Sequence, residues 1–340
     1  LCQGHKRILL VAGEYYNEKG LSYILEAIGS IYKARHNNAG IRRVNVNIAP
    51  LKVEEFRHLK TAHIGTYQLF QETYHRDTYR QVHIAGKKAD YNWRATAIHR
   101  AMEAGIDDVG IGTLFGLYDY RFELLSMMQH IRDLEQTFGV GPHTISVPRM
   151  EPATGSDLAS HPPYAVSDGE FLKIVAILRL AVPYTGIIMS TRENEAIRRE
   201  TFQLGVSQIS AGSRTNPGGY RDDQKESGQF FLGDHRSLEE VIRDLIRLKY
   251  IPSFCTGCYR LGRTGQDFMD LAKPGEIKKH CGPNALSSFM EYLMHYASPK
   301  TRDEGERLVE EIQSGMDGIA ARRARKLVDR VKEGQLDVFC

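Results

Sequence analysis

The stretch that decides the fold is RILLVAGE at residues 7–14, a short apolar run that ends in Gly13 and Glu14. The segment 21–34 then carries Ile24, Ile28 and Ile31 at the spacing of one helix face. A buried strand followed by an amphipathic helix is one βα unit, from which parallel sheets are built. We therefore expect the chain to enter a parallel α/β fold almost at once.

The same alternation continues along the chain. Further strands are expected at 44–48, 64–70, 109–112, 143–148, 186–190 and 208–211, and helices at 53–59, 91–104, 121–138, 171–181, 193–204 and 238–248. Seven strands in this order, without a dinucleotide-binding glycine fingerprint after the first, favour a (βα)8 TIM-type barrel over a doubly wound sheet. We expect the barrel to lack its first βα unit, with an upstream piece missing.

The region beyond Ile251 has a different character. It contains a cysteine cluster, a loop rich in glycine and arginine, and helical patterns at 287–296, 301–313 and 318–331. We predict a barrel over residues 1–250 and a C-terminal helical domain over residues 251–340. This second domain is expected to carry an auxiliary iron–sulfur cluster.

Composition limits the classes of function. Of 340 residues, 41% are hydrophobic and 26% are charged, with a net charge of +3, which is typical of a globular protein in solution. No basic stripe predicts a nucleic-acid partner, and no apolar run is long enough to span a membrane. Five cysteines, an odd number, favour a reducing compartment such as the cytoplasm.

The most informative motif is CTGC at residues 255–258, followed by Cys281 after a gap of 22 residues. Three thiols that converge would leave one coordination position open. A structural zinc knuckle is the alternative, but it needs a fourth ligand, and neither His280 nor Cys340 completes a familiar zinc pattern. Cations such as Arg263 would offset thiolate charge, so we favour an iron–sulfur cluster over zinc.

Polar residues follow several of the expected strands, where barrel enzymes place their chemistry. Glu14 follows the first, Glu72 lies in the segment QETYH after the third, and Arg94 lies in the segment DYNWR. Glu14 could be an ordinary cap, and Glu72 with Arg94 could be a surface pair. His143 could be a core histidine, but a lumen-facing histidine on its strand would suit metal binding or proton transfer.

Several segments together carry a family resemblance. The strand ending in Gly13-Glu14, QETYH at 71–75, DYNWR at 90–94 and GIGTLFGL at 110–117 resemble the aromatic amino-acid lyases of the radical S-adenosylmethionine (SAM) superfamily. That group includes the thiamine-pathway 2-iminoacetate synthases. The CxxC motif with its 22-residue gap to Cys281 resembles the HydG-type FeFe-hydrogenase maturases of the same group.

The resemblance implies a reaction and a set of roles. A 4Fe-4S cluster would reduce SAM to a 5′-deoxyadenosyl radical, and L-tyrosine would be cleaved to p-cresol and dehydroglycine. The glycyl fragment would become carbon monoxide and cyanide on an auxiliary cluster, for hydrogenase-maturation partner proteins. Gly13, Glu14, Glu72 and Arg94 would bind SAM. The auxiliary cluster would be held by Cys255, Cys258 and Cys281, with His143 as a ligand to an extra iron.

One departure bears on activity. The CxxxCxxC loop that holds the radical-generating cluster in this superfamily does not occur in the sequence, so we expect no SAM cleavage by this chain alone. The alternatives are a non-catalytic iron–sulfur scaffold, a thiamine-type 2-iminoacetate synthase, and a zinc-dependent barrel hydrolase or aldolase that uses His143.

Overall fold

A computed structural model describes residues 1–14, 20–216, 220, 228 and 230–340. The chain divides into two compact units. The first contains residues 1–9, 23–45 and 236–340, and the second contains residues 10–22 and 46–235. The division differs from the predicted boundary at residue 250, which stays a prediction about domains.

The central element is a seven-stranded sheet in which the strands follow their order in the chain. They are β1 (Arg7–Val11), β4 (Arg43–Asn47), β5 (Tyr67–Glu72), β6 (Val109–Thr113), β7 (Thr144–Ser146), β8 (Gly186–Met189) and β9 (Gln208–Ile209). All pairings from β4 to β9 are parallel. Because β1 and β9 form the two edges, the sheet is an open half-barrel, and the predicted α/β fold with a partial TIM-type barrel is confirmed.

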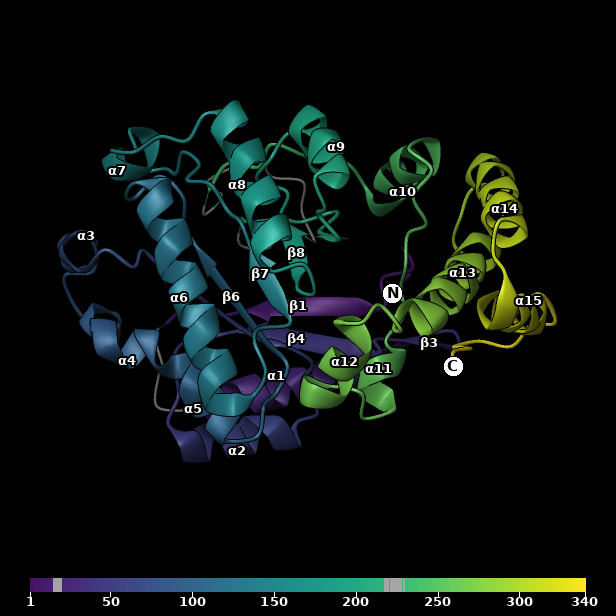
Figure 1. The fold of residues 1–340 in the computed structure, drawn as a ribbon, viewed down its shortest axis with the longest axis horizontal. Helices are drawn as coiled ribbons and strands as arrows, with labels where there is room; N and C mark the ends of the chain where they lie inside the picture. The colour runs from purple at the N-terminus through teal and green to yellow at the C-terminus, as the bar shows by residue number, and fades with distance from the viewer. Residues whose placement is uncertain (15–19, 217–219, 221–227, 229) are drawn as a thin grey trace. The chain divides into compact units, whose positions relative to one another are not determined.

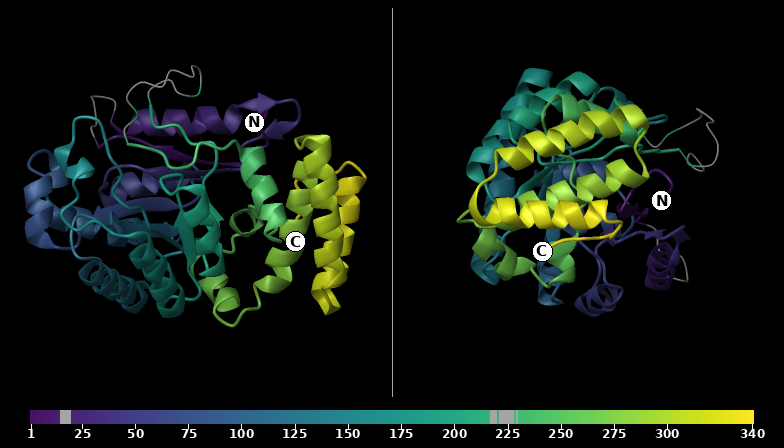
Figure 2. Two further views of the ribbon diagram at one scale, coloured as in Figure 1. Left: turned by 90° about the horizontal axis from the view of Figure 1, so that it is seen from above. Right: turned by 90° about the vertical axis from the view of Figure 1, so that its right-hand side faces the viewer.

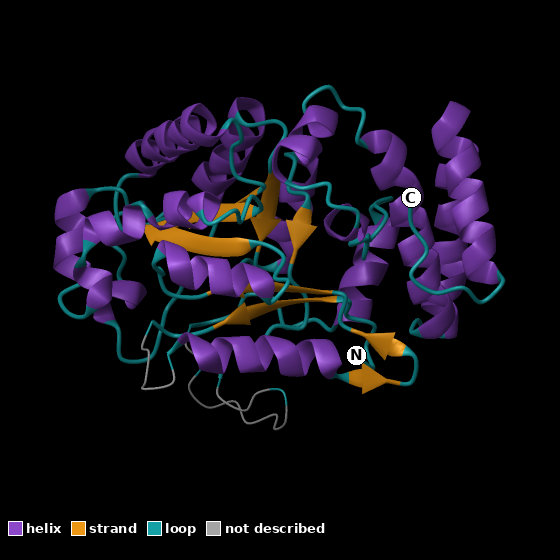
Figure 3. Cartoon of the chain, turned by 90° about the horizontal axis from the view of Figure 1, so that it is seen from below, coloured by secondary structure: helices purple, strands orange, loops and turns teal. Residues whose placement is uncertain are grey.

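Helices connect the strands of the second unit (Figures 1 and 3). They are α2 (Val53–Thr61), α3 (Arg76–Val82), the 3-10 turn η1 (Lys87–Ala89), α4 (Tyr91–Ala95), α5 (Ala97–Glu103), α6 (Tyr120–Phe138), α7 (Asp157–Ser160), α8 (Asp168–Ala181) and α9 (Glu195–Gln203). Local sequence sets the ends of α6. The Asp119 side chain caps its first turn, and Gly139 ends it with φ 76°, a conformation that favours glycine.

Two glycines allow the strands to approach one another closely. A Cβ on Gly110 would lie 2.5 Å from Thr144 Oγ1, and a Cβ on Gly112 would lie 2.7 Å from the Ser146 carbonyl oxygen. Larger residues at these positions would separate β6 from β7. The glycines of this strand therefore serve the packing of the sheet.

The first unit contains α1 (Leu21–Lys33) from Tyr23 onward, the hairpin of β2 (Arg35–His36) and β3 (Ala39–Gly40), and the C-terminal helices. These helices are α10 (Leu238–Arg247), α11 (Gly257–Arg260), α12 (Gly265–Ala272), α13 (Lys278–His295), α14 (Pro299–Ser314) and α15 (Gly318–Lys332). The last three lie side by side (Figure 2). The predicted C-terminal helices are therefore present, and α13 begins well before residue 287.

Helix α13 contains a proline in its second turn. Pro283 lacks the N–H that would bind the Lys279 carbonyl, and Arg323 of α15 donates to that oxygen instead, at 3.2 Å. Because α13 begins at Lys278, Cys281 lies on a helix. Helical geometry places it on a defined face of α13.

The predicted helix 91–104 is two helices, broken at Thr96. The Thr96 hydroxyl donates to the Asn92 carbonyl at 2.8 Å, which offers the backbone an alternative to a continuous helix. No helix in the described ranges combines the length and apolar character that crossing a bilayer requires.

Candidate cofactor and cluster sites

Three of the predicted SAM-binding residues meet in the second unit. The Arg94 guanidinium donates to Glu14 Oε1 at 2.5 Å and to Glu72 Oε1 at 3.0 Å. Its Nε donates to the Phe70 carbonyl at 2.7 Å, which ties α4 to the end of β5. Only 3% of the Arg94 side chain is exposed. The arrangement is a buried clamp rather than the surface pair that the sequence left open.

The backbone at Glu72 is unusual. Its φ is 71°, in the left-handed region that few non-glycine residues adopt, and the register between β5 and β6 shifts between Phe70 and Glu72. The shift turns the last residue of β5 so that its carboxylate reaches Arg94. Strain of this kind clusters at functional sites, so the distortion marks the end of β5 as a candidate site.

Lys88 completes the cluster, although no motif or spacing in the sequence pointed to it. Its ammonium lies 2.8 Å from Glu72 Oε1 and 3.4 Å from Glu14 Oε1. Burial opposes ionisation of Glu72, but Lys88 and then Arg94 outweigh it and hold the pKa of that carboxyl below its usual value. Two carboxylates and two cations therefore balance in charge.

The second oxygen of each carboxylate is the part of the cluster that can accept a ligand. Within the described part of the chain, no hydrogen bond reaches Glu14 Oε2 or Glu72 Oε2. Gly13 precedes Glu14, and a Cβ there would meet no atom within 4 Å. An ammonium group approaching the two carboxylates would find acceptors already oriented by Arg94.

A cavity of about 180 Å³ lies in the same unit, next to the carboxyl ends of β6 and β7. Arg149 lines it and forms ion pairs with Glu193 and, at 2.8 Å, with Asp168. Glu151 also lines it, and burial followed by the charge of Glu193 raises the pKa of the Glu151 carboxyl. The rest of the lining is mostly apolar: Phe115, Gly116, Met150, Pro162, Ala165 and Val166.

The three predicted cluster cysteines all belong to the first unit. Cys255 precedes α11, Cys258 lies on α11, and Cys281 lies on α13. Burial, followed by the charges of Cys258 and Cys255, raises the pKa of Cys281 to about 12, although the residue as a whole is exposed. Cys255 also raises the pKa of Cys258, so the three cysteines share one electrostatic neighbourhood.

Donors and cations surround these sulfurs. The Gly257 N–H donates to Cys255 Sγ at 3.2 Å. Arg263 lowers the pKa of both Cys258 and Cys281, against the larger opposing effect of burial. N–H···S bonds and nearby cations stabilise thiolates bound to iron, so the donor set fits an iron–sulfur cluster.

The geometry does not favour a single ion. Among residues 1–14, 20–216, 220, 228 and 230–340, no three His, Cys, Asp or Glu side chains converge closely enough to hold one metal ion. A cubane cluster makes a different demand, because each thiolate binds its own iron.

His143 lies apart from the clamp. It precedes β7, its N–H donates to the Val109 carbonyl at 2.9 Å, and its Nδ1 is 3.8 Å from Asp108 Oδ2. Glu72 ends β5 whereas His143 directly precedes β7, and in a parallel sheet these two positions lie at opposite ends of the strands. His143 belongs to the second unit and the cysteines belong to the first, so its predicted role as an iron ligand stays a prediction.

Comparison with known proteins gives a consistent family. The model of the biotin and thiamin synthesis associated domain matches residues 146–251. The 2-iminoacetate synthase of Salmonella typhimurium is 31% identical over 264 residues, which cover 77% of this chain and 68% of that protein. The crystal structure of HydG, a maturase of the [FeFe]-hydrogenase, matches with 48% identity and a TM-score of 0.95, covering 100% of this chain and 74% of that one. The chain belongs to the HydG and 2-iminoacetate synthase family.

A second HydG-family structure agrees. The FeFe-hydrogenase maturase HydG from Carboxydothermus hydrogenoformans matches with 46% identity and a TM-score of 0.82, covering 96% of this chain and 71% of that chain. This is a family of radical SAM lyases, and membership implies SAM and iron–sulfur clusters as cofactors. The HydG resemblance drawn from the cysteine spacing is therefore confirmed.

Proposed function

We propose that this chain is part of a radical SAM tyrosine lyase that supplies carbon monoxide and cyanide for assembly of the FeFe-hydrogenase cofactor. The observation that carries the proposal is the set of Cys255, Cys258 and Cys281, whose HydG-like spacing is joined by a shared neighbourhood in the first unit. The substrate would be L-tyrosine, and the products of its cleavage would be p-cresol and dehydroglycine. The partners would be hydrogenase-maturation proteins of the cytoplasm.

Within this proposal, Gly13, Glu14, Glu72 and Arg94 bind the methionine half of SAM. The free oxygens of Glu14 and Glu72 accept the ammonium group, while Arg94 holds both carboxylates in place. Sequence reasoning assigned Arg94 directly to the SAM carboxylate. Its present contacts support an orienting role, because all three of its nitrogens already donate to protein oxygens.

The auxiliary cluster would be held by Cys255, Cys258 and Cys281, with His143 proposed as a ligand to an extra iron. When bound, such a cluster would supply iron that binds small diatomic ligands. The three thiols would release their protons to solvent as they bind iron, and Arg263 would offset the charge of the thiolates. We assign the tyrosine substrate to the cavity beside Arg149 and Glu151, whose apolar wall suits an aromatic ring.

The test uses this chain joined to an upstream segment that carries CxxxCxxC. Cys258→Ser is expected to spare p-cresol formation from tyrosine and to abolish carbon monoxide, because only the auxiliary site is changed. The parent protein and Cys2→Ser, which changes an exposed cysteine, are the matched controls. Loss of p-cresol with the radical-generating cluster intact would show that the two sites do not divide the work in this way.

Two other readings are outcomes of the same experiment. A scaffold would bind the auxiliary cluster, detected by electron paramagnetic resonance (EPR) after anaerobic reconstitution with iron and sulfide, yet yield no p-cresol. A thiamine-type 2-iminoacetate synthase would form p-cresol without carbon monoxide, whether or not Cys258 is changed. Only the lyase proposal predicts both products in the parent protein.

A further inference from the structure

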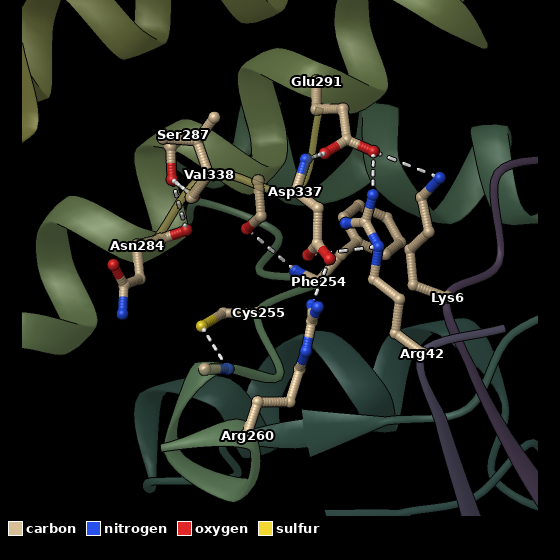
Figure 4. A network of polar contacts seen from close by, with 12 residues as sticks. Lys6, Arg42, Phe254, Cys255, Arg260, Asn284, Ser287, Glu291, Asp337 and Val338 are labelled. Atoms are coloured by element: carbon tan, nitrogen blue, oxygen red, sulfur yellow. Dashed lines mark hydrogen bonds and ion pairs between the residues drawn. The ribbon is translucent and has the colours of Figure 1, made fainter. Parts of the chain in front are cut away.

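The segment 337–340 lies along one face of helix α13. The Asp337 N–H donates to Glu291 Oε2 at 2.8 Å, and the Ser287 hydroxyl donates to the Val338 carbonyl at 2.9 Å (Figure 4). Glu291 is itself held by Arg42 at 2.6 Å and by Lys6 at 3.2 Å. Because Ser287 and Glu291 are both buried, the segment is fixed to the helix.

The direction of the segment follows from these contacts. As the chain advances from 337 to 340, its partners on α13 step back from Glu291 to Ser287 to Asn284. These positions are three and four residues apart, so they share one helix face. The next position on that face, three residues earlier, is Cys281. The segment therefore runs antiparallel to α13 and delivers Cys340 about one helical turn from a cluster thiol.

The backbone of Cys340 is clamped from two sides. Its N–H donates to Asn284 Oδ1 at 2.8 Å, and its carbonyl accepts from Asn284 Nδ2 at 3.1 Å and from Arg263 Nη2 at 2.7 Å. Asn284 is only 2% exposed. With the backbone fixed in this way, only the Cys340 side chain is left to turn.

The Cys340 thiol lies beside the residue that precedes Cys281. Its Sγ is 4.0 Å from Nδ1 of His280. Two arginines reach the same histidine nitrogen, Arg263 at 3.0 Å and Arg323 at 3.5 Å. The thiol of Cys340 and two cations therefore gather next to a cluster cysteine.

We propose that Cys340 is a fourth protein thiolate for the cluster held by Cys255, Cys258 and Cys281, placed there by the segment 337–340. This rests on the proposed function, because it presumes that an iron–sulfur cluster binds at this site. On binding iron, the thiol releases one proton and forms one Fe–S bond, with no change of oxidation state. Cys340 closes the position that three thiolates leave open, so an extra iron or a small ligand competes with it.

The charges at the site support a fourth thiolate. Arg43 lies over the ring of Tyr259, the residue that follows Cys258. Together with Arg263 and Arg323 it forms a set of cations within the first unit. A fourth thiolate adds one more negative charge to a cluster, and such a set of cations stabilises it.

A footprint of the cysteines tests the proposal in the chain as it exists. The chain is reconstituted anaerobically with iron and sulfide, treated with iodoacetamide, and analysed by mass spectrometry beside the metal-free chain. We expect the cluster to protect Cys340 as fully as it protects Cys255, while the exposed Cys2 stays reactive in both states. Alkylation of Cys340 at the same rate with and without the cluster would overturn the proposal.

A variant gives a second readout that does not depend on turnover. EPR spectra of the reduced cluster are recorded with and without added cyanide for the wild-type chain and for Cys340→Ser. Because cyanide has to compete with the Cys340 thiolate, we expect it to shift the Cys340→Ser signal at a several-fold lower concentration than the wild-type signal, at equal iron content. Equal shifts in the two proteins would refute the role of Cys340 and would leave the proposed function standing. If the wild-type chain takes up no cluster, the proposed function's site fails and this inference fails with it.

Discussion

Replacement of Arg94 by alanine is expected to destabilise the second unit by about 3 kcal/mol. The change removes three hydrogen bonds, to Glu14, Glu72 and the Phe70 carbonyl, and leaves two partly buried carboxylates facing Lys88 alone. Loss of one partner from a buried ion pair costs about 3–5 kcal/mol, and Lys88 keeps the value near the lower end. Arg94→Lys, which keeps the charge but not the fork, should cost less.

The assay is urea unfolding followed by the fluorescence of Trp93, the one tryptophan in the sequence and the neighbour of Arg94 on α4. The pKa of Glu72 is lowered in the folded state, so its stabilising effect is present above the unfolded pKa and is lost as the pH falls through the folded value. The deficit of Arg94→Ala should therefore shrink in acid. A loss below about 1 kcal/mol at pH 7.5, or a deficit that does not change with pH, would refute the clamp.

Three further outcomes follow from other positions. Burial lowers the pKa of His130 to about 4, so this histidine takes up a proton in the unfolded state at a higher pH than in the folded state. The free energy of unfolding should therefore fall by about 2 kcal/mol between pH 7.5 and pH 5. His130→Gln should remove this acid sensitivity, measured as urea midpoints over a pH series. Gly112→Ala should lower the free energy of unfolding by about 1–3 kcal/mol, because the added Cβ would meet the backbone of β7. Gly169→Ala, in the first turn of α8 with open space around it, should instead raise it by about 0.5–1 kcal/mol. Thermal melts should show a lower melting temperature for the first variant and a higher one for the second. Arg263→Gln should slow iodoacetamide alkylation of Cys258 several-fold at pH 8, because the thiolate loses a stabilising cation. An unchanged rate would show that Arg263 does not stabilise the Cys258 thiolate.

Much of the fold could be predicted because it depends on periodicity. All seven strands of the sheet appear where apolar runs were expected, since buried parallel strands leave a strong local signal. The breaks were harder to predict. The interruption at Thr96 depends on one side-chain hydrogen bond, and the early start of α13 depends on Arg323 taking the carbonyl that Pro283 leaves free.

In the candidate sites, too, residues that are placed by tertiary contacts were not predicted from the sequence. Glu14, Glu72 and Arg94 were predicted from their places after strands and from family resemblance, and they do meet. Lys88 was missed because it lies in a short 3-10 turn whose path depends on tertiary contacts. Cys340 was considered only as a zinc ligand, because its place beside α13 depends on a segment that no sequence period describes.

Strand β1 has a practical consequence for anyone who handles the isolated chain. It forms one edge of the sheet, with Leu9 43% and Val11 64% exposed, and no described strand covers its outer side. Open hydrogen-bonding groups flanked by apolar side chains are a template for strand addition between molecules. Concentrated solutions should therefore turn cloudy with time, and lysine at position 9 or 11 should keep them clear.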